Sequence, residues 1–147
     1  MSKINPEKPN FQEILKEEGS KEKIQGGLRE LLSFSFKYFE ANDKFNPYGR
    51  QIDYFTVLLD RLKEASKLSA TELRNNPSKT WRSHGVNWSD PRVSEDSFGL
   101  PNEEQLVDEA WQFSLRTNNY GRIIGFFIDT KFFIVWADCD HQLYPGD

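Results

Sequence analysis

Two apolar runs near the end of the chain constrain the fold more than any other feature. "RIIGFFID" and "KFFIVWAD", residues 122–129 and 131–138, are apolar at nearly every position. Strands that are apolar on both faces occur where a sheet is covered on both sides. Asp129 and Thr130 stand between the runs, and residues of this kind are typical of a tight turn. The pair therefore predicts a central hairpin that other elements must cover.

The segments before this hairpin supply the covering elements. "LLSFSFKYFE", residues 31–40, alternates apolar and polar side chains, which predicts a half-buried strand. Residues 51–67 place apolar side chains at helical spacing, and Ser69 with Glu72 forms a capping box that begins a second, short helix. "TWRSHGVNW" and "AWQFSLRT" predict two more strands. The order predicts an α+β fold: a small, mostly antiparallel sheet with two helices on one face.

The first thirty residues differ in character from the rest. They hold few large apolar side chains, two prolines and the charged run "KEEGSKEK", which predict a loosely attached charged arm over residues 1–30. The length of 147 residues fits one domain, so we expect a single α+β domain over residues 31–147.

The net charge of −4 is distributed unevenly. Residues 61–92 carry a net charge of +4, and residues 93–110 hold six acidic side chains and no basic one. Trp81, His84 and Trp88 lie within the basic stretch, and cations beside aromatic rings suit phosphate pairing and base stacking. The alternative to a nucleic-acid-binding surface is a solvent-exposed helix face with a few partly buried aromatic side chains. The acidic excursion suits a protein partner better than a phosphate backbone.

Several classes of protein are disfavoured. No run approaches the ~18 apolar residues of a membrane span, and the N-terminus lacks the layout of a signal peptide. With Cys139 as the single cysteine, we expect no disulfide framework, no disulfide-linked partner and a cytoplasmic location.

In "DCDH", Asp138 and Asp140 project from one side of an extended chain and His141 from the other. We therefore expect neither a metal site nor a cofactor.

The stretch "FSLRTNNYGRIIGFFIDTKFFIVWADCDHQLY", residues 113–144, resembles the C-terminal half of the RelE/ParE toxin superfamily, especially its YoeB-like branch. In that family a strand ends in Arg, a second Arg opens the next strand after a polar turn, and the last strand ends in His and Tyr. Arg116, Arg122, His141 and Tyr144 occur here in that order. The tail is also similar to that of small uncharacterised bacterial proteins.

The resemblance implies an RNA-acting, toxin-like domain that works as a metal-independent endoribonuclease, with RNA or an antitoxin-like protein as partner. Arg116 and Arg122 would then stabilise the charge on the phosphate, since a guanidinium matches phosphate oxygens and stays charged. His141 would act as acid or base, and Tyr144 would orient or donate. Arg82 and His84 alternate onto one strand face, and we expect them to bind substrate together with Arg116.

The alternative is a non-catalytic protein-binding or accessory module. In that case Arg116 and Arg122 solvate a turn, His141 caps a strand end and Tyr144 packs under the C-terminus. Trp81 and Trp88 are then core residues, with His84 as a satisfied polar neighbour. A third possibility is a small-ligand pocket lined by aromatic side chains, among them Trp111 and Trp136.

Overall fold

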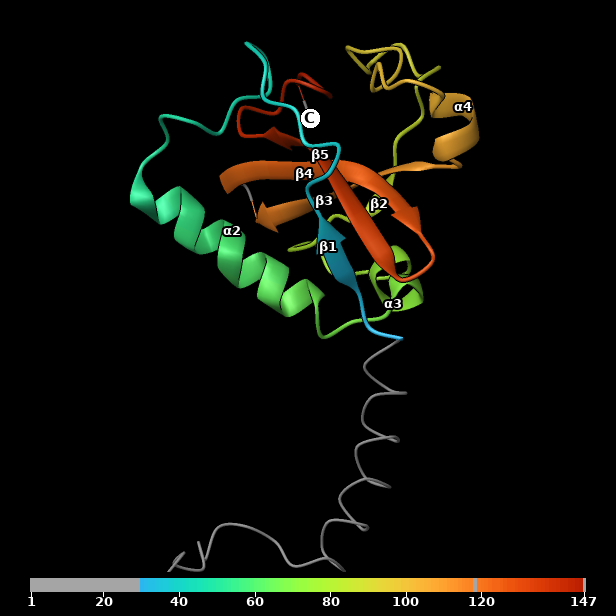
Figure 1. The fold of residues 1–147 in the computed structure, drawn as a ribbon. Coiled ribbons are helices and arrows are strands. Elements are labelled where there is room, and N and C mark those ends of the chain that lie inside the picture. Colours follow the sequence, from blue (N-terminus) through green and yellow to red (C-terminus); the bar gives the residue numbers. More distant parts are fainter. Residues whose placement is uncertain (1–29, 118, 147) are drawn as a thin grey trace, which may run out of the picture. The chain divides into compact units, whose positions relative to one another are not determined.

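The computed structural model describes residues 30–117 and 119–146, so the predicted arm over residues 1–30 lies, apart from Glu30, outside the described residues. The described chain forms one five-stranded sheet in the order β1-β5-β4-β3-β2 (Figure 1). The strands are β1 (Ser33–Ser35), β2 (His84–Gly85), β3 (Ala110–Arg116), β4 (Asn119–Ile128) and β5 (Lys131–Asp138). The helices are α2 (Ile52–Ala65), α3 (Ala70–Arg74) and α4 (Glu103–Leu106). Among the described residues, no helix is long and apolar enough to cross a membrane.

The predicted α+β class is confirmed. β3, β4 and β5 form an antiparallel meander, β2 adds antiparallel to β3, and β1 adds parallel to β5, so the sheet is mixed. The β4–β5 hairpin occupies the centre, as its two apolar runs predict, and residues 121–127 of β4 are all buried. The capping box at Ser69 and Glu72 is also present: the Ser69 hydroxyl accepts from the Glu72 amide, and the Glu72 carboxylate accepts from the Ser69 amide.

The two faces of the sheet are covered by different parts of the chain. α2 and α3 cover one face, where Tyr54, Val57 and Leu73 pack against Phe113 and Phe132. The loop before β3 and the C-terminal segment cover the other face; their buried residues there include Val86, Phe98, Leu143 and Tyr144. In Figure 1, α2 and α3 lie below the strands, and α4 and the C-terminal segment lie above them. Both faces are thus shielded from water, which the apolar hairpin requires.

The strand predicted over residues 31–40 is shorter than its alternation suggests. β1 pairs with β5 over three residues, and the chain then turns at Lys37 and Tyr38. Leu32 packs on the helical face, whereas Tyr38 packs on the opposite face against Phe126 and Phe133. The chain therefore crosses the sheet edge in the middle of the alternating run. The strand predicted at "TWRSHGVNW" likewise shortens to the two residues of β2.

The central hairpin contains one irregularity that its glycine explains. The pairing of β4 with β5 shifts register between Ile124 and Gly125, where Val135 is the extra residue of β5. A β-bulge of this kind bends the strand and increases its twist. A Cβ atom at Gly125 would lie 1.9 Å from the carbonyl oxygen of Phe133. The backbones thus approach more closely at this position than any side chain permits.

We expect Gly125→Ala to destabilise the fold by about 3 kcal/mol or more, because a methyl group cannot enter this contact without moving the hairpin backbone. Gly49→Ala is the matched control, since nothing lies within 4 Å of its Cβ position, although its φ of +87° adds strain. Gly49→Ala should cost on the order of 1 kcal/mol. Urea denaturation of both variants measures the difference. Equal costs would contradict the close approach at Gly125.

Candidate functional site

Buried polar side chains gather at one end of the sheet, on the face opposite α2 and α3. Across residues 30–117 and 119–146, the buried polar or charged residues are Gln112, Ser114, Arg122 and Asp138, each at most 4% exposed. The strand register aligns three of them, since Arg122 of β4 lies between Ser114 of β3 and Asp138 of β5. We call Ser114, Arg122 and Asp138 the polar row. Buried polar groups are costly unless they are hydrogen-bonded or paired, so their concentration marks a candidate site.

Asp138 connects the end of β5 to the C-terminal segment. Its Oδ1 accepts a hydrogen bond from the Gln142 amide at 2.7 Å, and its Oδ2 accepts one from the Leu143 amide at 2.9 Å. Burial raises the pKa of this carboxyl above its ordinary value. The two amides oppose that rise, as do the charges of His141 and Arg122. Asp138 therefore holds the segment in place and lies within electrostatic reach of two residues that the sequence singled out.

A basic depression opens beside the polar row. Lys79, Arg82, His84 and Arg122 line a hollow of about 530 Å³, and no acidic side chain is among these lining residues. Arg122 comes from the centre of the sheet, whereas the other three come from the loop that leads into β2 and from β2 itself. Arg82 has a φ of +42°, in the left-handed region that disfavours residues with a Cβ atom. Strained residues of this kind cluster at functional sites.

The imidazole of His84 is held at both nitrogens. Its Nδ1 lies 2.8 Å from the carbonyl oxygen of Gly85, and its Nε2 lies 2.8 Å from Nε2 of Gln112. A carbonyl oxygen can only accept, so Nδ1 carries the proton, and the Gln112 amide donates to Nε2. The ring of Tyr144 meets the His84 ring edge-on, with the centroids 5.7 Å apart. The neutral ring is therefore fixed in one tautomer and one orientation.

Of the residues predicted from the sequence, the structure brings Arg82, His84 and Arg122 together, with Tyr144 in contact with His84. Tyr144 is buried, and its hydroxyl accepts a hydrogen bond from the Asn87 amide at 3.4 Å. His141 lies close enough to Asp138 to lower the pKa of that carboxyl against the effect of burial. Its Nδ1 is buried without a hydrogen-bond partner among the described residues, and its φ is +55°.

Arg116 does not join this group. Its guanidinium lies 5.7 Å from the ring centroid of Tyr120, whose hydroxyl donates to Asp53 of α2. Its charge also contributes to a lowered pKa of Arg61 on the same helix, after the larger effect of burial. A register shift between Ser114 and Arg116 accounts for this position. Arg82 and His84 thus share their hollow with Arg122, whereas we expected Arg116.

The polar tail of β5 does not gather metal ligands. Across the described residues, no group of three or more His, Cys, Asp or Glu side chains could hold a metal ion. Asp140 is ion-paired with Arg50, away from the two acceptor bonds of Asp138. Burial raises the pKa of the Cys139 thiol, which disfavours the reactive thiolate.

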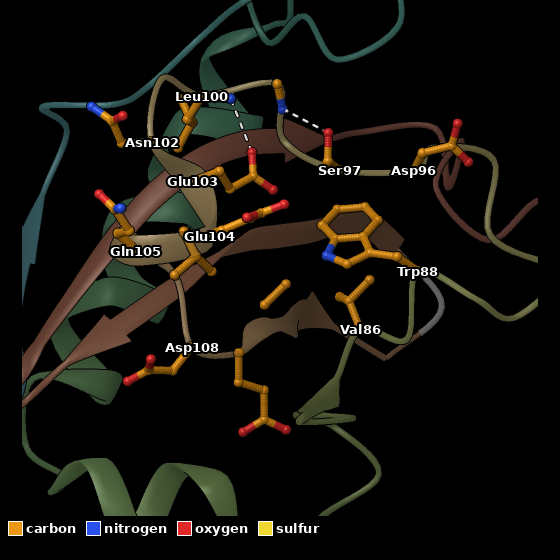
Figure 2. A pocket seen from close by; sticks show the side chains of 14 residues that line it. Val86, Trp88, Asp96, Ser97, Leu100, Asn102, Glu103, Glu104, Gln105 and Asp108 are labelled. Atoms are coloured by element: carbon orange, nitrogen blue, oxygen red, sulfur yellow. Dashed lines mark hydrogen bonds between the residues drawn. The ribbon is translucent and has the colours of Figure 1, made fainter.

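A second hollow, the acidic groove, is lined by α4, the loop that precedes it and the residues that follow β2 (Figure 2). Its volume is about 700 Å³, and no basic side chain is among its lining residues. The carboxylates that line it belong to Asp96, Glu103, Glu104, Asp108 and Glu109. Glu103 closes the preceding loop, because its carboxylate accepts from the amides of Phe98 and Leu100. Val86 and Trp88, at the end of the segment that leads out of the basic depression, line the same groove.

Sequence reasoning missed Gln112, Ser114, Asp138 and Lys79 as members of the site. Gln112 and Ser114 did carry a signal, since they interrupt the apolar strand "AWQFSLR" at alternate positions and therefore share a face. Their alignment with Arg122 and Asp138 depends on strand register, which no local pattern determines.

We expect the stability of the protein to depend on pH through Asp138. Because burial raises the folded-state pKa of this carboxyl, its protonated form favours folding below the ordinary carboxyl pKa of about 3.9. That contribution is lost as the pH rises through the folded-state value. Asp138→Asn has no such dependence, although one backbone amide loses its acceptor at a cost of about 1–3 kcal/mol at every pH.

The free energy of unfolding of the wild type, relative to Asp138→Asn, should therefore fall as the pH rises above about 4. Urea denaturation of both proteins at a series of pH values measures this difference. A wild type that instead gains stability relative to the variant over that range would show that Arg122 and the two amides outweigh burial.

Comparisons with known proteins do not assign a role to this arrangement. A scan against protein-family models found no match for the chain, and neither a curated protein nor a solved structure matched it. The chemistry of the site therefore has to be inferred from its own residues and their geometry.

Proposed function

We propose that this protein acts on RNA and binds a backbone phosphate in the basic depression, as a toxin-like domain that cleaves RNA without a metal. The observation that carries the proposal is the lining of the hollow, where the side chains of Lys79, Arg82, His84 and Arg122 meet. Phosphate contacts supply most of the affinity of nucleic-acid binding. A guanidinium suits a phosphodiester well, since its planar fork matches two oxygens.

The charge pattern of the whole chain is compatible with this function despite its acidic total. The net charge of −4 belongs largely to residues 93–110, which include all five carboxylates of the acidic groove. A phosphate backbone is attracted at the basic depression and repelled at the acidic groove, so the two hollows orient a bound strand.

Cleavage needs a group that transfers a proton, and His141 is the better candidate of the two histidines. Both ring nitrogens of His84 are already engaged by Gly85 and Gln112. His141 has no described partner at Nδ1 and lies beside Asp138, the neighbour of Arg122 in the polar row. Arg122 then stabilises charge on the phosphate, and Arg82 with Lys79 holds the adjoining backbone.

We expect Arg82→Ala and Lys79→Ala each to weaken binding of a short single-stranded oligoribonucleotide on the order of tenfold at low salt. Each variant should also reduce the slope of log K against log salt by about 0.7. Fluorescence anisotropy over a range of salt concentrations measures both quantities. Lys131→Ala is the matched control, because this exposed lysine begins β5 at the hairpin turn.

His141→Ala should leave this binding in place and lower the cleavage rate on the order of 10²- to 10⁴-fold. Expression of the wild type in bacteria should arrest growth, and the same substitution should relieve the arrest. Equal binding by the wild type, Arg82→Ala and Lys131→Ala would refute the RNA-binding role of the depression. Unchanged cleavage by His141→Ala would refute the catalytic assignment while leaving RNA binding intact.

A non-catalytic protein-binding module is the second candidate, and the acidic groove favours it. Asp96, Glu104, Asp108 and Glu109 appear in no ion pair among the described residues, so their charge is available to a basic partner. Under this function a lysine-rich peptide binds, and the oligoribonucleotide does not. Asp108→Lys should weaken peptide binding on the order of tenfold, whereas Asp60→Lys on the exposed side of α2 should not. Equal binding by both variants would count against the groove.

A further inference from the structure

Exposed apolar side chains gather around one hollow beside α2. The described residues include five large apolar side chains that are exposed to water: Phe36, Tyr48, Ile52, Leu59 and Ile128. All of them except Ile128 lie at this place. Phe36 and Tyr48 line the hollow, and Ile52 and Leu59 belong to α2, which lines it with Phe55 and Leu58. We call the hollow together with Phe36, Tyr48, Ile52 and Leu59 the α2 surface. Apolar side chains gathered in this way mark an interaction site.

The hollow of the α2 surface is apolar throughout. Its volume is about 320 Å³, and its lining residues are all apolar or aromatic. Ile123 of β4 and Ile134 of β5 contribute to it from the sheet. A small apolar molecule could fill this space, but it would leave Ile52 and Leu59, which are 84% and 66% exposed, in water. A protein partner can fill the hollow and cover both side chains.

The charges along α2 indicate which partner fits. The first nine residues of the helix expose Asp53 and Asp60 and hold no basic residue. The rest of the helix exposes Lys63, whereas Glu64 is ion-paired with Lys67 just after the helix. Neither Asp60 nor Lys63 forms an ion pair with another described residue. The exposed charge therefore changes from acidic to basic along the helix.

Two-fold symmetry matches all of these features. In a symmetric dimer the same patch on both chains forms the interface, so a projection and a hollow on one patch fill each other twice. A two-fold axis perpendicular to α2 also makes the two helices antiparallel, and the acidic half of each then lies beside the basic half of the other. A different protein would have to supply a matching hollow and matching charges, whereas a second copy already carries them.

We infer that this protein forms a symmetric dimer through the α2 surface, in which Ile52 and Leu59 of each chain are covered by the other chain. The two α2 helices run antiparallel, and the hollow of each chain receives an apolar side chain from its partner. The inference goes beyond the proposed function and does not depend on it, because the polar row lies on the other face of the sheet. The dimer carries two basic depressions.

Sedimentation equilibrium of the full chain over a wide range of concentrations measures the mass and the Kd of the dimer. We expect the mass of two chains at high concentration. Leu59→Glu and Ile52→Glu should each raise the Kd on the order of a hundredfold, because the symmetry buries the new carboxylate twice. Ile128→Glu is the matched control and should leave the Kd unchanged, since Ile128 is also exposed but ends β4, outside the α2 surface.

Lys63→Glu tests the antiparallel arrangement. It makes the exposed charge of both halves of α2 acidic, so it should raise the Kd on the order of tenfold at low salt and by less at high salt. Lys131→Glu, which makes the same change in charge at the start of β5, should have no effect. An unchanged Kd in Lys63→Glu would refute the antiparallel arrangement.

Two results would overturn the dimer itself. One is a monomer at every concentration, and binding of an apolar dye by that monomer would show that the hollow takes a small molecule instead. The other is a dimer whose Kd changes in neither Leu59→Glu nor Ile52→Glu, because its interface would lie elsewhere. Both side chains are largely exposed, so we expect circular dichroism to show that these variants keep the fold. Oligoribonucleotide binding per chain should be the same in Leu59→Glu and the wild type, so either proposal can fail without the other.

Discussion

The structure depends on one requirement: the β4–β5 hairpin is apolar on both faces, so both faces must be kept from water. α2 and α3 cover one side, and the loop before β3 with the C-terminal segment covers the other. β1 and β3 complete the hydrogen bonding of the hairpin on its two edges. The positions of the remaining elements follow from the need to cover this hairpin.

The polar row is the exception to that apolar interior. Arg122 and Asp138 occupy the same end of the hairpin, where the sheet face passes from packed side chains to the basic depression. The backbone amides of Gln142 and Leu143 hold the carboxylate, so covering the sheet and organising the site use the same C-terminal segment. Residues 79–88 then connect the basic depression to the acidic groove within a few residues. Residues 79–88 therefore contribute to both hollows, although the two hollows carry opposite charges.

Local patterns predicted the elements well and their alignment poorly. Apolar runs, helical spacing and the capping box at Ser69 predicted the hairpin, α2 and α3, because each depends on neighbouring residues. The candidate site depends on register, and two register shifts decide its membership. The shift after Ser114 accompanies the displacement of Arg116 toward α2. No sequence pattern predicted the role of Asp138, because its hydrogen-bond partners lie in a segment without regular structure.

The central claim is that the basic depression, built on Arg122 and the segment around Arg82 and His84, is where a nucleic-acid ligand binds. The most direct measurement is a map of backbone amide shifts by NMR as a short oligoribonucleotide is added to the full chain. The account predicts that the largest changes fall at residues 79–85, 112–114 and 122, with little change at 103–109. Changes centred on the acidic groove, or spread evenly over the chain, would contradict it.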